Sequence, residues 1–167
     1  VCTEHVPTDY AAMENQIRAA KIYNTDTLVR IPRGSYSDYI KPLEADASGI
    51  MVPHVMSLAD AKDVVWTTRF HPIGRRAIDG GNADGAYCML DAAQYIKTAN
   101  EQRFVAIQIE DHEPLDEPEE IAKLDGIDML FFGPGDFSQS IGTPGQWDNP
   151  LIAKARERIA KIARDNG

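Results

Sequence analysis

The stretch Ile-Asp-Met-Leu-Phe-Phe-Gly-Pro-Gly-Asp-Phe-Ser, residues 127–138, decides the fold of this chain. Its first half is a near-continuous apolar run, which is typical of a parallel strand covered on both faces. The run stops at Gly133-Pro134-Gly135, which predicts a turn, and Asp136 follows directly. Because α/β proteins with parallel sheets place their chemistry on the loops after the strands, Asp136 is a candidate site residue.

A second apolar run, Phe104 to Glu110, ends in the same way, with Gln108 and Glu110 at its carboxyl end. The carboxyl ends of parallel strands meet at one edge of a sheet, so Glu110 and Asp136 are expected to lie close together. Carboxylates are the ligands of hard divalent cations. The two strand ends therefore predict one divalent metal ion.

Strand, loop and helix alternate along the whole chain, with no hairpin signal. This order predicts a parallel sheet with right-handed crossovers, either doubly wound or closed as a barrel, in a single domain over residues 1–167. The Gly-rich polar stretch 70–87 interrupts the pattern and is expected to be functional or mobile. Strands are expected at 1–3, 28–31, 49–52, 104–110 and 127–132, and helices from Thr8 or Asp9, from Ser37, from Ser57, over 90–102, over 118–126 and from Asn149 or Pro150.

Composition narrows the function classes. The 167 residues carry a net charge of −9, which argues against nucleic acid or an anionic membrane as a partner but leaves a small acidic substrate possible. Cys2 and Cys88 are far apart and predict neither a disulfide framework nor a zinc site, so a reducing cytoplasm is expected. No apolar run reaches the roughly 20 residues of a membrane span.

Five polar residues share one property, because each lies at or just after the end of an expected strand. Taken singly, His5 reads as a loop residue, Arg30 as half of a structural ion pair, Glu110 as the start of a solvated acidic segment and Asp136 as a helix cap. Taken together these residues indicate a functional site, because an arginine in a sheet needs a partner and paired inward carboxylates need a cation. The five are His5, Arg30, Gln108, Glu110 and Asp136.

Six short blocks of the chain resemble, in order and near the family's spacing, the HpcH/HpaI aldolase family of the phosphoenolpyruvate/pyruvate barrel superfamily. They are Thr3-Glu4-His5, Val29-Arg30-Ile31-Pro32, Met51-Val52-Pro53-His54-Val55, Gly74-Arg75-Arg76, Gln108-Ile109-Glu110 and Gly133-Pro134-Gly135-Asp136-Phe137-Ser138. The resemblance implies a (β/α)₈ TIM barrel, a homo-oligomer that is usually a hexamer, and a magnesium, manganese or cobalt ion at the strand ends.

The resemblance also implies residue roles. Glu110 and Asp136 would be the metal ligands, with Gln108 lining the same site. Arg30 would hold the keto oxygen and stabilise the enolate, and His5 would be the base. The backbone N–H groups of Gly135 and Asp136 would bind the pyruvate carboxylate, and Arg75 and Arg76 would meet the distal part of the acceptor.

The implied reaction is cleavage of a 4-hydroxy-2-oxo acid to pyruvate, through its enolate, and an aldehyde. No lysine lies at an expected strand end, which favours the metal route over a Schiff base. Two departures from the family pattern leave alternatives open: Cys2 replaces the usual aspartate, and Ala77-Ile78-Asp79-Gly80 follows the arginine pair in place of Gly-Val-Gly. The alternatives are a decarboxylase or lyase on oxaloacetate-like acids or acyl-CoA thioesters, and a silent oxo-acid-binding homologue.

Length is a third departure. A full barrel takes roughly 250 residues, so the first strand and the last two βα units are expected to be absent from this sequence, which opens at Val1 in what reads as the tail of a strand. Open strand edges favour association. A stable monomer of this chain alone is therefore not expected.

Overall fold

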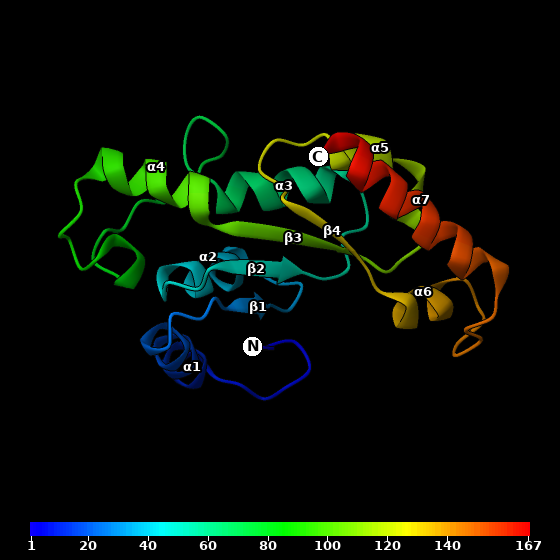
Figure 1. The fold of residues 1–167 in the computed structure, drawn as a ribbon, viewed down its shortest axis with the longest axis horizontal. Coiled ribbons are helices and arrows are strands. Elements are labelled where there is room, and N and C mark those ends of the chain that lie inside the picture. Colours follow the sequence, from blue (N-terminus) through cyan, green and yellow to red (C-terminus); the bar gives the residue numbers. More distant parts are fainter.

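The computed structural model describes all residues 1–167 and shows a four-stranded, wholly parallel sheet in the order β1-β2-β3-β4, with helices between the strands (Figure 1). The strands are β1 (Leu28–Arg30), β2 (Gly49–Val52), β3 (Phe104–Ile109) and β4 (Met129–Phe132). The helices are α1 (Tyr10–Ile22), α2 (Tyr36–Glu44), α3 (Leu58–Thr68), α4 (Ala92–Gln102), α5 (Pro118–Ala122), α6 (Pro134–Ser140) and α7 (Pro150–Asn166), with 3-10 turns at Ala83–Gly85 and Glu113–Asp116.

The amino-terminal residues continue the sheet beyond β1, as the sequence predicts. Cys2 and Arg30 form an isolated parallel bridge. The Arg30 N–H donates to the Val1 carbonyl at 2.9 Å, and the Thr3 N–H donates to the Arg30 carbonyl at 2.8 Å. This pairing places the Glu4-His5 loop at the carboxyl edge of the sheet, beside the end of β1.

The core lies between the strands and the inner faces of the helices. Ile50, Ile107 and Ile109 of the central strands are fully buried, and they pack in one cluster with Ile17 of α1 and Leu43 of α2. Apolar residues at helical spacing supply the inner face of each helix, so the burial follows the pattern in the sequence. No helix is both long enough and apolar enough to cross a bilayer.

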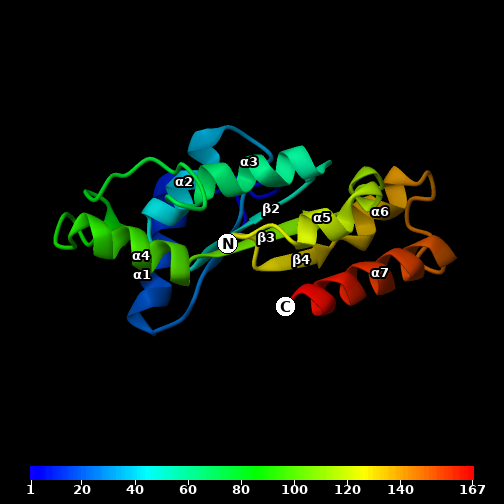
Figure 2. The same ribbon diagram turned by 90° about the horizontal axis from the view of Figure 1, so that it is seen from above.

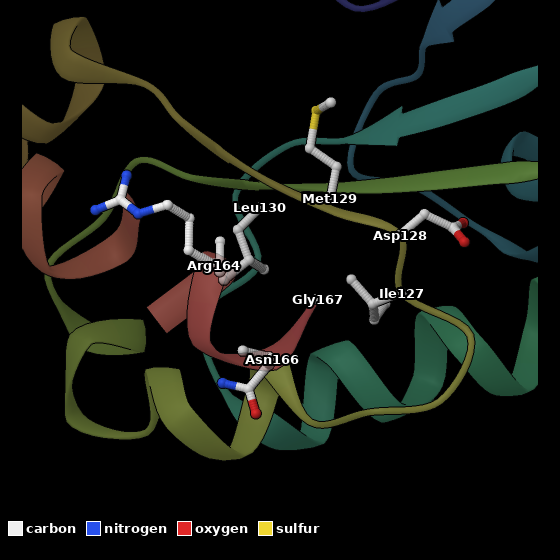
Figure 3. Close-up of a pocket in the computed structure, with 9 residues that line it drawn as sticks. Ile127, Asp128, Met129, Leu130, Arg164, Asn166 and Gly167 are labelled. Carbon is white, nitrogen blue, oxygen red and sulfur yellow. The ribbon is translucent and has the colours of Figure 1, made fainter. Parts of the chain in front are cut away.

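The expectation that the strand at 127–132 is covered on both faces is wrong. Met129 and Phe131 lie on the same face of β4 and are 42% and 43% exposed, because nothing in this chain packs on that face of the last strand. A groove of about 460 Å³ lies between β4 and the end of α7 (Figure 3). Leu130 of β4 and Arg164 of α7 both line this groove, and no group of catalytic residues converges on it.

Three predicted helix boundaries shift, and one predicted turn is the start of a helix. The helix expected from Ser37 begins at Tyr36, because Ser35 is its N-cap and forms a capping box with Asp38. The helix expected over 90–102 begins at Ala92, capped by Asp91.

The helix expected over 118–126 ends at Ala122, and Gly126 instead takes a positive φ of 102° in the turn before β4. The predicted Gly133-Pro134-Gly135 turn is the start of α6, with Pro134 in its first turn, a position that proline favours. Asp136 therefore lies inside the first turn of a helix rather than capping one.

Candidate active site

Three side chains from three consecutive loops meet at the carboxyl edge of the sheet. Glu110 follows β3, Asp136 lies in α6 after β4, and His54 follows β2. One ligand atom from each of the three lies within 4.8 Å of the other two. The predicted convergence of Glu110 and Asp136 is thus present in the structure, and His54 joins them.

Glu110 is a buried carboxylate, with the residue only 2% exposed. Its Oε1 accepts the backbone N–H of His54 at 3.0 Å, and its Oε2 accepts the side-chain amide of Gln108. Burial raises the pKa of Glu110 above the usual carboxyl value, against the lowering effect of these hydrogen bonds and of His54. Gln108 therefore lines the site as expected, by holding the Glu110 carboxylate.

Gly133 makes room for this carboxylate. A Cβ at Gly133 would lie 2.7 Å from the Oε2 atom of Glu110 and 3.0 Å from Nε2 of Gln108. A Cβ there would therefore force the Glu110 carboxylate and the Gln108 amide to move. The glycine that ends β4 is needed here because the backbone passes directly against the buried acid.

His54 is a member of the site that reasoning from the sequence missed. Its Nδ1 lies 2.9 Å from Oδ2 of Asp111 and 3.7 Å from Oε1 of Glu110. Burial lowers the pKa of His54, but the hydrogen bond to Asp111 and the charge of Glu110 outweigh it, so the pKa is raised. The signal was available, because His54 directly follows the Val52-Pro53 end of β2, in the position that singled out the other residues.

Arg30 lies at the end of β1, and its guanidinium has two partners. Its Nε is 3.1 Å from Oε2 of Glu4, and its Nη2 is 3.4 Å from the sulfur of Cys2. The hydrogen bond to Cys2 and the charges of Glu4 and Glu110 raise the pKa of Arg30 further. The arginine is thus held in place by its own amino-terminal segment, with 31% of its side chain left exposed.

His5 and Cys2 belong to the same group. Nε2 of His5 lies 3.4 Å from Oε2 of Glu4, so Glu4 links His5 to Arg30, while the His5 side chain is 59% exposed. Burial raises the pKa of Cys2, but hydrogen bonds from the His5 backbone and from Arg30 outweigh it and lower the pKa. Donors that face a sulfur in this way favour its ionised form.

Gly135 and Asp136 occupy the first turn of α6, where backbone N–H groups have no acceptor within the helix. A Cβ at Gly135 would meet nothing within 4 Å, so the space above this turn is open. Asp136 itself is exposed. The end of β4 therefore offers both a carboxylate and free N–H donors to a bound molecule.

Arg75 and Arg76 are not brought to this site. The Arg76 N–H donates to the carbonyl of Arg69, and Arg69 in turn donates to the carbonyl of Gly126, just before β4. The backbone at Arg75 and Arg76 therefore lies beside the amino-terminal ends of the strands, opposite the edge that carries Glu110 and Asp136. The Arg76 side chain is 1% exposed, pairs with Asp84 at 2.6 Å, and lies 4.7 Å from the ring centre of Phe70.

Arg75 lies over the ring of Trp66 at 5.0 Å. The helix α4, which carries the Arg76 partner Tyr95, and the helix α6, which carries Asp136, stand at opposite ends of the molecule in both views (Figures 1 and 2). Within this chain Arg76 therefore lies away from Glu110 and Asp136, and a contact of either arginine with substrate stays a prediction. The Arg76 guanidinium holds the 70–91 segment together.

The residues present fit a divalent cation. Glu110 is a buried acid with no lysine or arginine paired to it, and Oε1 of Gln108 is buried beside it without a hydrogen-bond partner. Hard and borderline divalent ions take oxygen and imidazole ligands at about 2.0–2.6 Å, so donors within 4.8 Å of one another can share one ion. An ion there would compensate the buried charge.

Comparison with known proteins agrees with this geometry. Residues 4–167 match the family model described as HpcH/HpaI aldolase/citrate lyase, so the chain belongs to that family. The sheet is accordingly part of a TIM barrel. A structure of an HpcH/HpaI aldolase/citrate lyase family protein from Burkholderia cenocepacia J2315 superimposes with a TM-score of 0.90 at 31% identity, over 99% of this chain and 66% of that one.

Two curated relatives have names that specify an aldolase reaction. A 2-keto-3-deoxy-L-rhamnonate aldolase of Klebsiella pneumoniae is 30% identical over 164 residues, 98% of this chain and 61% of the relative. A hydroxypyruvate/pyruvate aldolase of Roseovarius nubinhibens is 30% identical over 160 residues, 95% of this chain and 62% of the relative. The chain thus spans somewhat under two thirds of the length of these relatives.

Proposed function

We propose that this chain carries the catalytic edge of a metal-dependent carbon–carbon lyase that acts on 2-oxo acids, cleaving a 4-hydroxy-2-oxo acid to pyruvate and an aldehyde. The observation that carries the proposal is that Glu110 and Asp136, from neighbouring strand ends, lie close enough together to share one cation. The family membership and the aldolase names of both curated relatives support the reaction class.

Glu110 and Asp136 would hold a magnesium, manganese or cobalt ion, with Gln108 keeping the Glu110 carboxylate in place. When bound, such an ion supplies Lewis-acid stabilisation of negative charge on the substrate oxygens. The buried position of Glu110 makes its charge more effective than it would be in water.

Arg30 would bind the 2-oxo oxygen and stabilise the negative charge that develops there when the carbon–carbon bond breaks. Its contacts with Glu4 and Cys2 hold the guanidinium before substrate arrives, so little reorganisation is required. The open first turn of α6 would bind the substrate carboxylate through the N–H groups of Gly135 and Asp136.

Cleavage also requires a base for the 4-hydroxyl proton. His5 would serve, because it is exposed at the same edge and is joined to Arg30 through Glu4. Histidine is the side chain most often used as a general base in catalysis. The exposure of His5 leaves its ring free to meet a substrate that lies on Arg30.

The test is exchange of the pyruvate methyl protons with deuterium oxide, followed by NMR, in the presence of magnesium, manganese or cobalt. Exchange reports formation of the enolate without any aldehyde and therefore does not depend on the unidentified acceptor. We expect metal-dependent exchange that Glu110→Gln and Arg30→Ala each reduce at least about 100-fold. Absence of exchange with every metal would refute the proposed chemistry, and metal binding without exchange would indicate a silent binding protein.

A further inference from the structure

His54 is held so that its main chain and its ring both face the acids of the site. It has a φ of 50°, a left-handed conformation that is uncommon for residues other than glycine. This conformation directs its N–H to Oε1 of Glu110, 3.0 Å away. Strained backbone of this kind persists where the surroundings demand it and is concentrated at functional sites.

The ring of His54 is oriented by a neighbouring acid. Oδ2 of Asp111, the residue after Glu110, lies 2.9 Å from Nδ1 of His54. In the neutral ring this contact makes Nδ1 the donor and leaves the lone pair on Nε2. Histidines that bind metals are commonly oriented by a carboxylate that contacts the imidazole ring.

We infer that His54 is a third protein ligand of the metal, with Asp111 as the residue that orients it. The inference rests on the proposed function, because it assumes that Glu110 and Asp136 bind a cation. Its own support is independent of that assumption: a ring nitrogen of His54 lies within 4.8 Å of the ligand oxygens of both acids. Three donors from three successive strand loops then surround one position.

A nitrogen ligand changes which ion the site selects. Two carboxylates alone suit magnesium, calcium or manganese, whereas imidazole adds affinity for cobalt, nickel, zinc and iron. The site built from His54, Glu110 and Asp136 therefore selects cobalt or zinc over magnesium. Removal of His54 should reduce the preference for cobalt over magnesium without abolishing metal binding.

The experiment measures metal binding directly. The protein is titrated with Co²⁺, followed by visible absorption, and with Mg²⁺, followed by calorimetry. Nitrogen coordination is read from the electron spin echo of bound Mn²⁺. His54→Asn is the main variant, because asparagine tolerates a positive φ. His112→Gln is the matched control, because His112 lies in the next loop and is 56% exposed beside Glu113.

We expect His54→Asn to weaken Co²⁺ binding about 10- to 100-fold, to weaken Mg²⁺ binding less than about threefold, and to abolish the nitrogen signal of Mn²⁺. Asp111→Asn should weaken Co²⁺ binding by a smaller factor, and His112→Gln should change nothing. Circular dichroism checks that each variant is folded, and Asp111→Asn keeps the test available if His54→Asn unfolds.

Two other outcomes are distinguishable. If Co²⁺ binds and only Glu110→Gln weakens it, with the Mn²⁺ nitrogen signal unchanged in His54→Asn, the inference is overturned and the proposed function stands. If no divalent ion binds the unmodified chain, the proposed function fails, and the inference fails with it.

Discussion

Gly133→Ala is the substitution that most directly tests how the site is built. The added methyl would lie 2.7 Å from the Oε2 atom of Glu110 and 3.0 Å from Nε2 of Gln108. Gly133 has a φ of −97°, so alanine meets no backbone strain there. Any effect of the substitution therefore comes from the collision with the Glu110 carboxylate.

The expected size follows from the packing around that carboxylate. Glu110 and Gln108 are 2% and 4% exposed, so neither can swing into solvent to make room. Forcing one methyl group into a closed site costs about 1–3 kcal/mol of unfolding free energy. A ligand displaced by a few tenths of an ångström should also reduce metal affinity by about 10- to 100-fold.

Urea unfolding followed by circular dichroism measures the first quantity, and Co²⁺ titration measures the second. Gly135→Ala is the control, because it lies two residues away in the same segment and its added methyl would meet nothing within 4 Å. This control should unfold at the same urea concentration as the unmodified chain or a slightly higher one. If the two variants behave alike, the close approach of Gly133 to Glu110 is not a determinant of the site.

Three further outcomes are expected. Asp84→Ala leaves the buried Arg76 without its partner and should lower the free energy of unfolding in urea by about 3–5 kcal/mol. Arg158→Ala breaks the exposed ion pair with Glu119 and should lower it by less than about 1 kcal/mol. Because burial raises the pKa of Glu110, the folded state holds that proton more tightly, so the metal-free protein should lose stability as pH rises through this raised pKa. Glu110→Gln should remove that loss, and denaturation in chelator at several pH values checks it. Phe131→Lys places a charge on the exposed face of the last strand and should reduce association measured by light scattering, without a large change in urea midpoint.

The local signals in the chain predicted most of the elements correctly. Apolar runs mark β3 and also β2, which lies between Gly49 and Pro53. Caps at Asp9, Ser57 and Asn149 mark the starts of α1, α3 and α7. Helix ends were less predictable. Gly126 was expected to end the helix, but α5 ends at Ala122 and Gly126 lies in the turn before β4.

Two departures from the sequence pattern share one physical cause, which is that exposure depends on what packs against a residue. Phe131 reads as a core residue from its apolar neighbours, yet it lies at an open edge. Arg76 reads as a loop cation available to substrate, yet Asp84 and Tyr95 enclose it. Partners this far along the chain leave no local pattern in the sequence.

By itself the sequence determined the alternation of strands and helices and the strand ends that carry Glu110, Asp136 and Arg30, because both follow from local patterns of residues. Only the tertiary structure decided that His54 contacts Glu110 and Asp111 at that edge and that Asp84 encloses Arg76 away from it. The reason is distance: the atoms that form a site come from separate loops, and their separation is fixed by how the strands pair and how the helices pack on them.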